Sequence, residues 1–191
     1  MTLLLREIRA CRHCAAELPC GPRPVLQVGA GARVAIIGQA PGSRVHESGI
    51  PWDDASGEHL REWLDVSVQG FRDPERFAII PMGFCYPGKG ASGDRPPRPE
   101  CAPLWHARLF ARLGELRLTL LVGQYAHAAY LGARRERTLQ ATVARFLDYL
   151  PHYFVLPHPS WRSRLFRQKN PWFDAELLPE LRQRIARALG S

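Results

Sequence analysis

Four short runs of apolar residues constrain the fold of this chain more than any other feature. They cover residues 34–37, 77–80, 118–122 and 153–156. Each run is shorter than a typical helix and has the length of a buried strand. Continuous rather than alternating apolar runs are typical of parallel strands that are covered on both faces. The sequence therefore predicts four parallel strands in one central sheet.

Segments with the apolar spacing of helices separate these strands. We expect helices over residues 58–66, 103–116, 124–131, 138–147 and 171–189. Strands that alternate with helices predict an α/β fold, here a three-layer α/β/α sandwich with a four-stranded parallel central sheet. The segment 86–99 is rich in Gly and Pro, so no regular structure is expected there. A length of 191 residues suits a single domain over residues 1–191.

The chain is strongly basic, with a formal net charge of +8 and a pI near 9.8. Lys89 and Lys169 are its only lysines, so almost all of the positive charge is arginine. From residue 159 onward there are seven basic residues and three acidic ones. This placement favours a polyanionic partner such as nucleic acid, although a GC-rich genome would also raise the arginine content.

No apolar run approaches the roughly 18 to 20 residues that a membrane span needs. The first ten residues, MTLLLREIRA, are too short and too charged for a signal peptide. We therefore expect a cytoplasmic protein without membrane association, and a monomer suits the fold.

The five cysteines fall into two spaced pairs and one isolated residue. Cys11 and Cys14 form a C-x2-C pair, while Cys85 and Cys101 flank the Pro- and Gly-rich segment. In a cytoplasmic protein disulfides are not expected, so the cysteines favour metal or redox chemistry. The spacing alone leaves an iron–sulfur cluster, a zinc site and unliganded cysteines open. Cys20 belongs to neither pair and is expected to be a free thiol.

Three of the predicted strands end in unusual sequences: GQAPG, PMGFCYPG and PHPSWR. In open parallel sheets, ligands bind beyond the carboxyl ends of the strands. The turn GQAPG (38–42) is followed by the aromatic-tipped loop SGIPW (48–52), which suggests a pocket for a flat ligand. A nucleotide-binding α/β domain is an alternative, but the turn lacks the G-x-G-x-x-G and Walker spacings.

Taken together, these motifs resemble those of the uracil-DNA glycosylase superfamily, and of its iron–sulfur family four branch in particular. The 70 residues between Cys14 and Cys85 and the 15 between Cys85 and Cys101 match that branch. GQAPG with SGIPW resembles the first motif of the family, LPHPS (156–160) its second, and VGQYAHAAYLG (122–132) a further strand and helix. The resemblance covers nearly the whole chain.

The resemblance implies a uracil-DNA glycosylase-like fold and a structural [4Fe-4S] cluster. The matching ligands are Cys11, Cys14, Cys85 and Cys101, so the N-terminal segment of about residues 1–32 would contribute one pair of ligands. A structural zinc ion is the alternative. The implied partner is DNA, single- or double-stranded, that contains a damaged base.

The implied activity is that of a monofunctional DNA glycosylase. Such an enzyme flips a deaminated base, uracil above all, out of DNA and hydrolyses its N-glycosidic bond, which initiates base excision repair. Two alternatives remain at this point. The protein is a glycosylase for another damaged base such as hypoxanthine or xanthine, or it is a catalytically weak or inactive nucleic-acid-binding member of the same fold.

Four residues of the motifs match roles in the pocket of the family. His158 aligns with the catalytic histidine, and its neutral ring would donate a hydrogen bond to O2 of the departing base. Trp52 aligns with a phenylalanine that stacks on the base. Gln39 and Ala40 would place backbone N–H groups near the base.

The sequence departs from the family pattern at two places. The asparagine that reads uracil is missing, and its position falls on Pro81, so we expect backbone groups at Met82 and Gly83 to read the base. A side chain lost from such a site weakens specificity.

The second departure is in the first turn. The family has an acid where this chain has Gln39. Water activation is therefore expected from His46 or Glu47. The pair Asp53–Asp54 is an alternative that would otherwise cap the following helix.

The arginine-rich segment after LPHPS predicts a DNA-facing surface. Trp161 and Arg162, with Leu165, would form a wedge for the gap that a flipped base leaves. The loop 89–98 is a further candidate for phosphate contacts. The predicted DNA-binding residues are Ser160, Trp161, Arg162, Arg164, Arg167 and Lys169.

Overall fold

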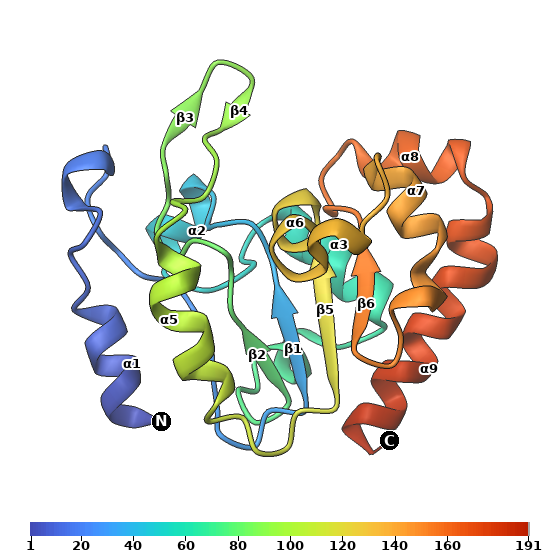
Figure 1. Cartoon of the computed structure of the whole chain (residues 1–191), viewed down its shortest axis with the longest axis horizontal. Coiled ribbons are helices and arrows are strands. Elements are labelled where there is room, and N and C mark those ends of the chain that lie inside the picture. The colour runs from blue at the N-terminus through green and yellow to red at the C-terminus, as the bar shows by residue number, and fades with distance from the viewer. Residues whose placement is uncertain (191) are drawn as a thin grey trace.

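The computed structural model describes residues 1–190 and confirms the α/β class, with one parallel sheet at its centre (Figure 1). The strands are β1 (Val34–Ile37), β2 (Phe77–Ile79), β5 (Leu118–Val122) and β6 (Tyr153–Leu156). Their order in the sheet is β2-β1-β5-β6, and each neighbouring pair is parallel. All four lie where the sequence predicts strands.

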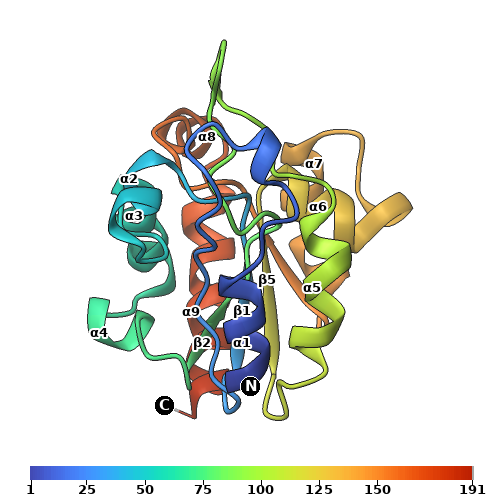
Figure 2. The ribbon, with the colours of Figure 1, turned by 90° about the vertical axis from the view of Figure 1, so that its left-hand side faces the viewer.

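Helices cover both faces of this sheet (Figure 2), as the sequence predicts. One face carries α3 (Ala55–Leu64) and α9 (Leu178–Leu189), and α9 contacts both β1 and β5. The other face carries α5 (Cys101–Phe110), α6 (Gln124–Leu131) and α7 (Leu139–Ala144). The result is the expected three-layer sandwich.

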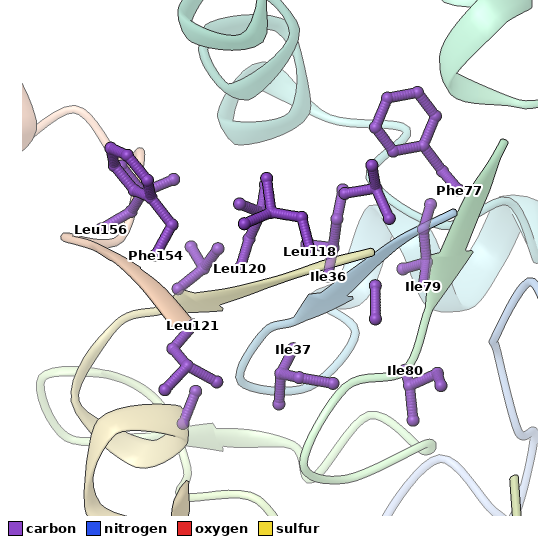
Figure 3. Close-up of a cluster of buried hydrophobic side chains, with 14 of the residues drawn as sticks. Ile36, Ile37, Phe77, Ile79, Ile80, Leu118, Leu120, Leu121, Phe154 and Leu156 are labelled. Carbon is purple, nitrogen blue, oxygen red and sulfur yellow. The ribbon is translucent and has the colours of Figure 1, made fainter. Parts of the chain in front are cut away.

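The side chains of the central strands alternate between the two layers of helices. Figure 3 shows Ile36 and Leu120 on the side of α3, and Ile37 and Leu121 on the side of α6. All four side chains are buried. Because both faces are covered, both sets of alternating positions must be apolar, which explains the continuous apolar runs in the sequence.

The structure adds short elements to those expected from the sequence. The additional helices are α1 (Thr2–Arg9), α2 (Ser43–Ser48), α4 (Val68–Phe71) and α8 (Ser163–Lys169). Single 3-10 turns lie at Ala15–Glu17, Gly132–Arg134 and Phe146–Tyr149, and a π-helical turn at Phe173–Leu177 leads into α9. One buried apolar cluster extends from Leu4 in α1 to Ala188 in α9.

The expectation that residues 86–99 lack regular structure is wrong. They contain an antiparallel hairpin of β3 (Lys89–Gly90) and β4 (Gly93–Asp94), in which Gly90 pairs with Gly93. Gly93 has a φ of 135°, which residues with a side chain rarely adopt, so glycine makes the tight hairpin possible. The hairpin projects beyond the carboxyl edge of the sheet (Figure 1).

Among the described residues, no helix has both the length and the apolar character that crossing a bilayer requires.

Candidate active site

The carboxyl ends of all four central strands border one pocket. It is lined by Gly38 after β1, Pro81 after β2, Gly123 after β5 and His158 after β6. Its volume is about 780 Å³, within the range of sites for small organic ligands. The strand topology therefore gathers the unusual strand-end sequences into one cavity, at the edge where open parallel sheets bind ligands.

Trp52 forms a flat wall of this pocket. Its backbone φ is 56°, in the left-handed region that aromatic residues rarely adopt. The indole lies so close to Gly38 that a Cβ added there would stand 3.0 Å from Trp52 Cζ2, so a side chain at this position would press against the indole. The Trp52 and His158 rings lie 5.6 Å apart between centroids, with 33° between their planes. The two rings that the sequence predicts to act on one base are therefore neighbours.

Burial lowers the pKa of His158 from the ordinary value of 6.5, while the negative charges of Asp54 and Asp94 act in the opposite direction. The ring is therefore neutral at neutral pH. A neutral imidazole still carries one N–H, so His158 can donate a hydrogen bond into the pocket.

Two further histidines hold the loop and strand ends around His158. His59 Nδ1 on α3 lies 3.2 Å from the carbonyl oxygen of Pro159. The buried His127 ring on α6 places Nε2 3.0 Å from the carbonyl oxygen of Leu121 in β5. The first contact joins the segment after β6 to α3, and the second joins α6 to β5.

His106 contacts Pro81, one of the residues that line the pocket. Its Nε2 lies 3.0 Å from the Pro81 carbonyl oxygen and its Nδ1 lies 2.6 Å from the Tyr130 hydroxyl. A carbonyl only accepts, so Nε2 carries the proton and Nδ1 accepts from Tyr130. Burial lowers the pKa of His106 and raises that of Tyr130, so both groups stay neutral.

The backbone donors predicted to read the base are engaged elsewhere in this structure. Met82 N–H donates to the Gly38 carbonyl at 2.9 Å, and Gly83 N–H donates to the Gln39 carbonyl at 3.0 Å. Pro81, rather than Met82 or Gly83, lines the pocket. The two bonds tie the segment after β2 to the GQAPG turn. Base reading by these N–H groups would require the bonds to open.

Gln39 and Ala40 of the turn line the pocket as expected, but the structure does not bring His46 and Glu47 to it. The residue of α2 that faces the pocket is Val45. His46 packs against Tyr86 with 5.9 Å between ring centroids, and Glu47 is exposed.

The aspartate pair before α3 has structural partners. Asp54 Oδ1 accepts a hydrogen bond from Gly57 N–H at 2.8 Å and so caps α3, which was the alternative considered from the sequence. Asp53 forms an ion pair with Arg72 at 2.8 Å. Asp54 also lines the pocket, whereas Asp53 does not.

The predicted DNA-facing residues lie at the rim of the pocket and on α8. Ser160, Trp161 and Arg162 line the rim. The Trp161 side chain is 72% exposed, and the Arg162 guanidinium lies over its ring at 5.1 Å. The exposed indole therefore stands at the mouth of the pocket, where the sequence predicts a DNA-facing surface.

The basic residues of α8 differ in their freedom to bind phosphates. Arg164 and Lys169 are exposed. Arg167 instead forms an ion pair with Asp174 at 2.8 Å, which partly neutralises it. Of the hairpin loop 89–98, Lys89 and Arg95 are exposed, while Arg98 is paired with Glu100 at 2.8 Å.

Sequence reasoning did not single out several other residues that line the pocket. Gln124 lies two residues after the end of β5, so its place near the end of a predicted strand is a signal that the sequence offers. The sequence offers no such signal for Asp94, because the unpredicted hairpin brings it to the pocket. The additional polar lining residues are Ser56, Ser92, Asp94, Gln124, Tyr125 and Ser163.

The four paired cysteines come from three segments that meet near the start of α5. Phe84 N–H, next to Cys85, donates to Cys101 Sγ at 3.3 Å. Cys14 Sγ lies 3.9 Å from Glu100, the neighbour of Cys101. Figures 1 and 2 both place the segment after α1 beside the upper end of α5. The two sequence pairs therefore converge in space.

The pKa of the Cys85 thiol is raised to about 11 and that of the Cys101 thiol to about 12, mainly by burial, and the nearby thiols of Cys11 and Cys14 act in the same direction. Among the described residues, however, no three His, Cys, Asp or Glu side chains are arranged closely enough to hold a metal ion. The donor set and its convergence fit a thiolate-ligated centre, but the ligand shell is not closed. Cys20 is exposed and stands apart from these pairs.

The fold and the pocket define an α/β protein with a cavity at the carboxyl edge of its sheet, beside an exposed aromatic and basic rim. The model of the uracil DNA glycosylase superfamily matches residues 26–182, and the chain belongs to that superfamily. Membership gives the protein a DNA glycosylase-like role and makes DNA its partner. The matched residues contain every residue that lines the pocket except Val25, together with Cys85 and Cys101.

Proposed function

We propose that this protein is a monofunctional DNA glycosylase that removes uracil from DNA and so initiates base excision repair. One observation carries the proposal: the neutral ring of His158 and the indole of Trp52 lie side by side in the pocket at the strand ends. A flipped pyrimidine that stacks on the indole would bring its O2 to a hydrogen-bond donor.

This arrangement suits the cleavage of a glycosidic bond. The base leaves with the electron pair of the C1′–N bond, and negative charge develops on its O2. A neutral donor in a partly desolvated site stabilises that charge as it forms, and loss of one such donor typically slows a reaction about 100- to 1,000-fold. The Trp52 ring holds the base in the plane where this hydrogen bond can form, and stacking on an aromatic ring contributes about 1–3 kcal/mol per base.

Pro81 supports a second candidate substrate class, the deaminated purines hypoxanthine and xanthine. A proline has neither an amide side chain nor an N–H with which to read uracil. The amide side chains of the pocket lining are Gln39 and Gln124, on the first and third strand ends. Their long side chains suit a less selective site than a short asparagine fixed beside the base.

Oligonucleotides with one uracil, hypoxanthine or xanthine, as duplex and as single strand, test the proposal. After incubation with the protein, hot alkali converts each abasic site into a strand break. We expect breaks at uracil, with weaker cleavage at the purines. An unmodified oligonucleotide is the matched control. If no substrate is cleaved although the protein binds DNA in a salt-sensitive way, the protein is a binding member of the fold rather than an enzyme.

We further propose that Cys11, Cys14, Cys85 and Cys101 hold an iron–sulfur cluster that fixes the N-terminal segment. Their number, their type and their convergence near α5 support this, and a structural zinc ion is the alternative. Anaerobically purified protein should contain about four iron and four sulfide per chain. Cys85→Ser should lose them, whereas Cys20→Ser should keep them. Stoichiometric zinc without sulfide would contradict the cluster.

A further inference from the structure

The β3–β4 hairpin delivers a carboxylate to the pocket. Ser92, Gly93 and Asp94 line the same cavity as His158, although the hairpin projects away from the sheet (Figure 1). A Cβ placed on Gly42 of the GQAPG turn would lie 3.5 Å from Asp94 Oδ2. Asp94 therefore lies beside the GQAPG turn. Its charge also reaches the imidazole of His158.

The two oxygens of Asp94 have different surroundings. Oδ1 accepts a hydrogen bond from the Tyr86 hydroxyl at 3.3 Å, and Tyr86 is buried. Oδ2 is the Asp94 oxygen beside Gly42, and both residues line the cavity. A carboxylate held by one oxygen, with the other beside the pocket lining, is positioned to act on a ligand there.

The other acids near the pocket are less suited to chemistry. Asp54 Oδ2 also approaches Gly42, at 3.9 Å from the same Cβ position, but Asp54 Oδ1 is the cap of α3. Glu47 and Asp53 do not line the cavity, and Asp53 is paired with Arg72. Asp94 is thus the pocket acid that no helix cap or guanidinium engages among the described residues.

We propose that Asp94 is a catalytic residue that faces C1′ of the flipped nucleotide. This inference rests on the proposed glycosylase function. As the C1′–N bond breaks, its electron pair leaves with the base, and His158 donates a hydrogen bond to the developing anion. The Asp94 carboxylate stabilises the cationic sugar. It then accepts a proton from the water whose oxygen bonds to C1′.

The step balances without a further reactant. Water supplies the hydroxyl on C1′ and one proton, which Asp94 takes up. Because Asp94 is exposed to solvent on the hairpin, it can pass this proton to water, and the departed base anion takes a proton from solvent. The carboxylate then returns to its starting state.

Single-turnover uracil release tests this role, with Asp94→Asn as the variant. The change keeps the size and the hydrogen-bond acceptor for Tyr86 but removes the charge. We expect the rate to fall by about 100- to 10,000-fold, the usual contribution of a general base, while the affinity for DNA is kept. Asp65→Asn is the matched control, since Asp65 is an exposed residue at the carboxyl end of α3. Asp54→Asn preserves a helix-capping residue and should lose less activity than Asp94→Asn.

Two abasic-site analogues separate failure of this inference from failure of the proposed function. One oligonucleotide carries a cationic pyrrolidine in place of the sugar, and the other carries a neutral tetrahydrofuran. The affinity of the protein for each is measured in the presence of free uracil. We expect the wild type to prefer the cation and Asp94→Asn to lose that preference. If Asp94→Asn releases uracil at a rate within threefold of the wild type, or still prefers the cationic analogue, the catalytic role of Asp94 is wrong. The proposed glycosylase function is then unaffected. If the wild type releases no base but prefers the cationic analogue in a way that depends on Asp94, the proposed glycosylase activity is wrong. The position of Asp94 beside the bound sugar is then still supported.

Discussion

At the scale of single residues, the pocket is organised by buried neutral histidines. His158 faces the cavity, His106 fixes Pro81, and His127 contacts the end of β5. Burial lowers the pKa of all three below the ordinary value of 6.5. Each must stay uncharged for its part of the structure to remain packed, so the site is sensitive to acid.

The free energy of unfolding should therefore fall as the pH drops from 6.5 toward the lowered pKa values. In this window the unfolded chain binds protons that the folded protein does not, and each such group contributes a slope of up to about 1.4 kcal/mol per pH unit. Urea titrations at a series of pH values measure the slope.

The His106→Gln variant should show a smaller slope, because glutamine can donate to Pro81 without titrating. His152→Gln, which changes an exposed histidine, is the control and should leave the slope unchanged. Equal slopes for the wild type and His106→Gln would contradict this account of His106.

Some positions of single residues in the site can be predicted from the sequence, and others cannot. His158 and Trp52 belong to recognisable motifs, LPHPS and SGIPW, near the ends of predicted strands, so their common pocket follows from the parallel topology. The partners of Met82 and Gly83 N–H do not, because these bonds cross to the turn after β1 and depend on the tertiary fold. The rotation of α2, which turns Val45 rather than His46 or Glu47 to the pocket, also depends on packing.

At the scale of elements, the β3–β4 hairpin connects the N-terminal segment to the pocket. Gly88 precedes the hairpin with a φ of 88°, and a Cβ there would stand 2.5 Å from Pro19 Cγ. Gly88 O also accepts from Arg95 N–H at 2.9 Å. The segment that follows the C-x2-C pair therefore packs on the base of the hairpin that carries Asp94.

Gly88→Ala should displace this hairpin. The left-handed φ disfavours alanine and the added methyl overlaps Pro19, so we expect a loss of more than about 1 kcal/mol in the free energy of unfolding. Hydrogen exchange should become faster in residues 89–94.

Gly90→Ala is the matched control on the same hairpin. Its added Cβ would meet its nearest neighbour, Gly93 O, at 3.4 Å, which is an ordinary contact. It should leave both stability and exchange close to the wild type. Equal exchange in the two variants would mean that Pro19 does not hold the hairpin.

The elements that can be predicted well from the sequence are the four strands, which are continuous apolar runs, and the longer helices, whose apolar residues show a helical period. The hairpin and α2 are too short for a period, and the hairpin depends on a glycine turn inside a segment whose Pro and Gly content predicts coil.

At the scale of the whole molecule, the parallel sheet is what makes the site. Its order places the ends of β1 and β5 at the centre, and those of β2 and β6 beside them. Because all four strands run in the same direction, four distant sequence segments meet at one edge of the sheet (Figure 1). The net charge of +8 attracts a polyanion to the same molecule, and exposed Arg164 and Lys169 lie on α8 just beyond the pocket rim.

The most direct test of the central claim is the release of free base under single-turnover conditions. Wild-type protein is mixed in excess with an oligonucleotide that contains one uracil, and free uracil is separated by chromatography and quantified by mass. We predict stoichiometric uracil from the wild type and release about 100- to 1,000-fold slower from His158→Ala. Absence of free uracil from the wild type, or equal rates from both proteins, would contradict the claim that this pocket cleaves the glycosidic bond of uracil.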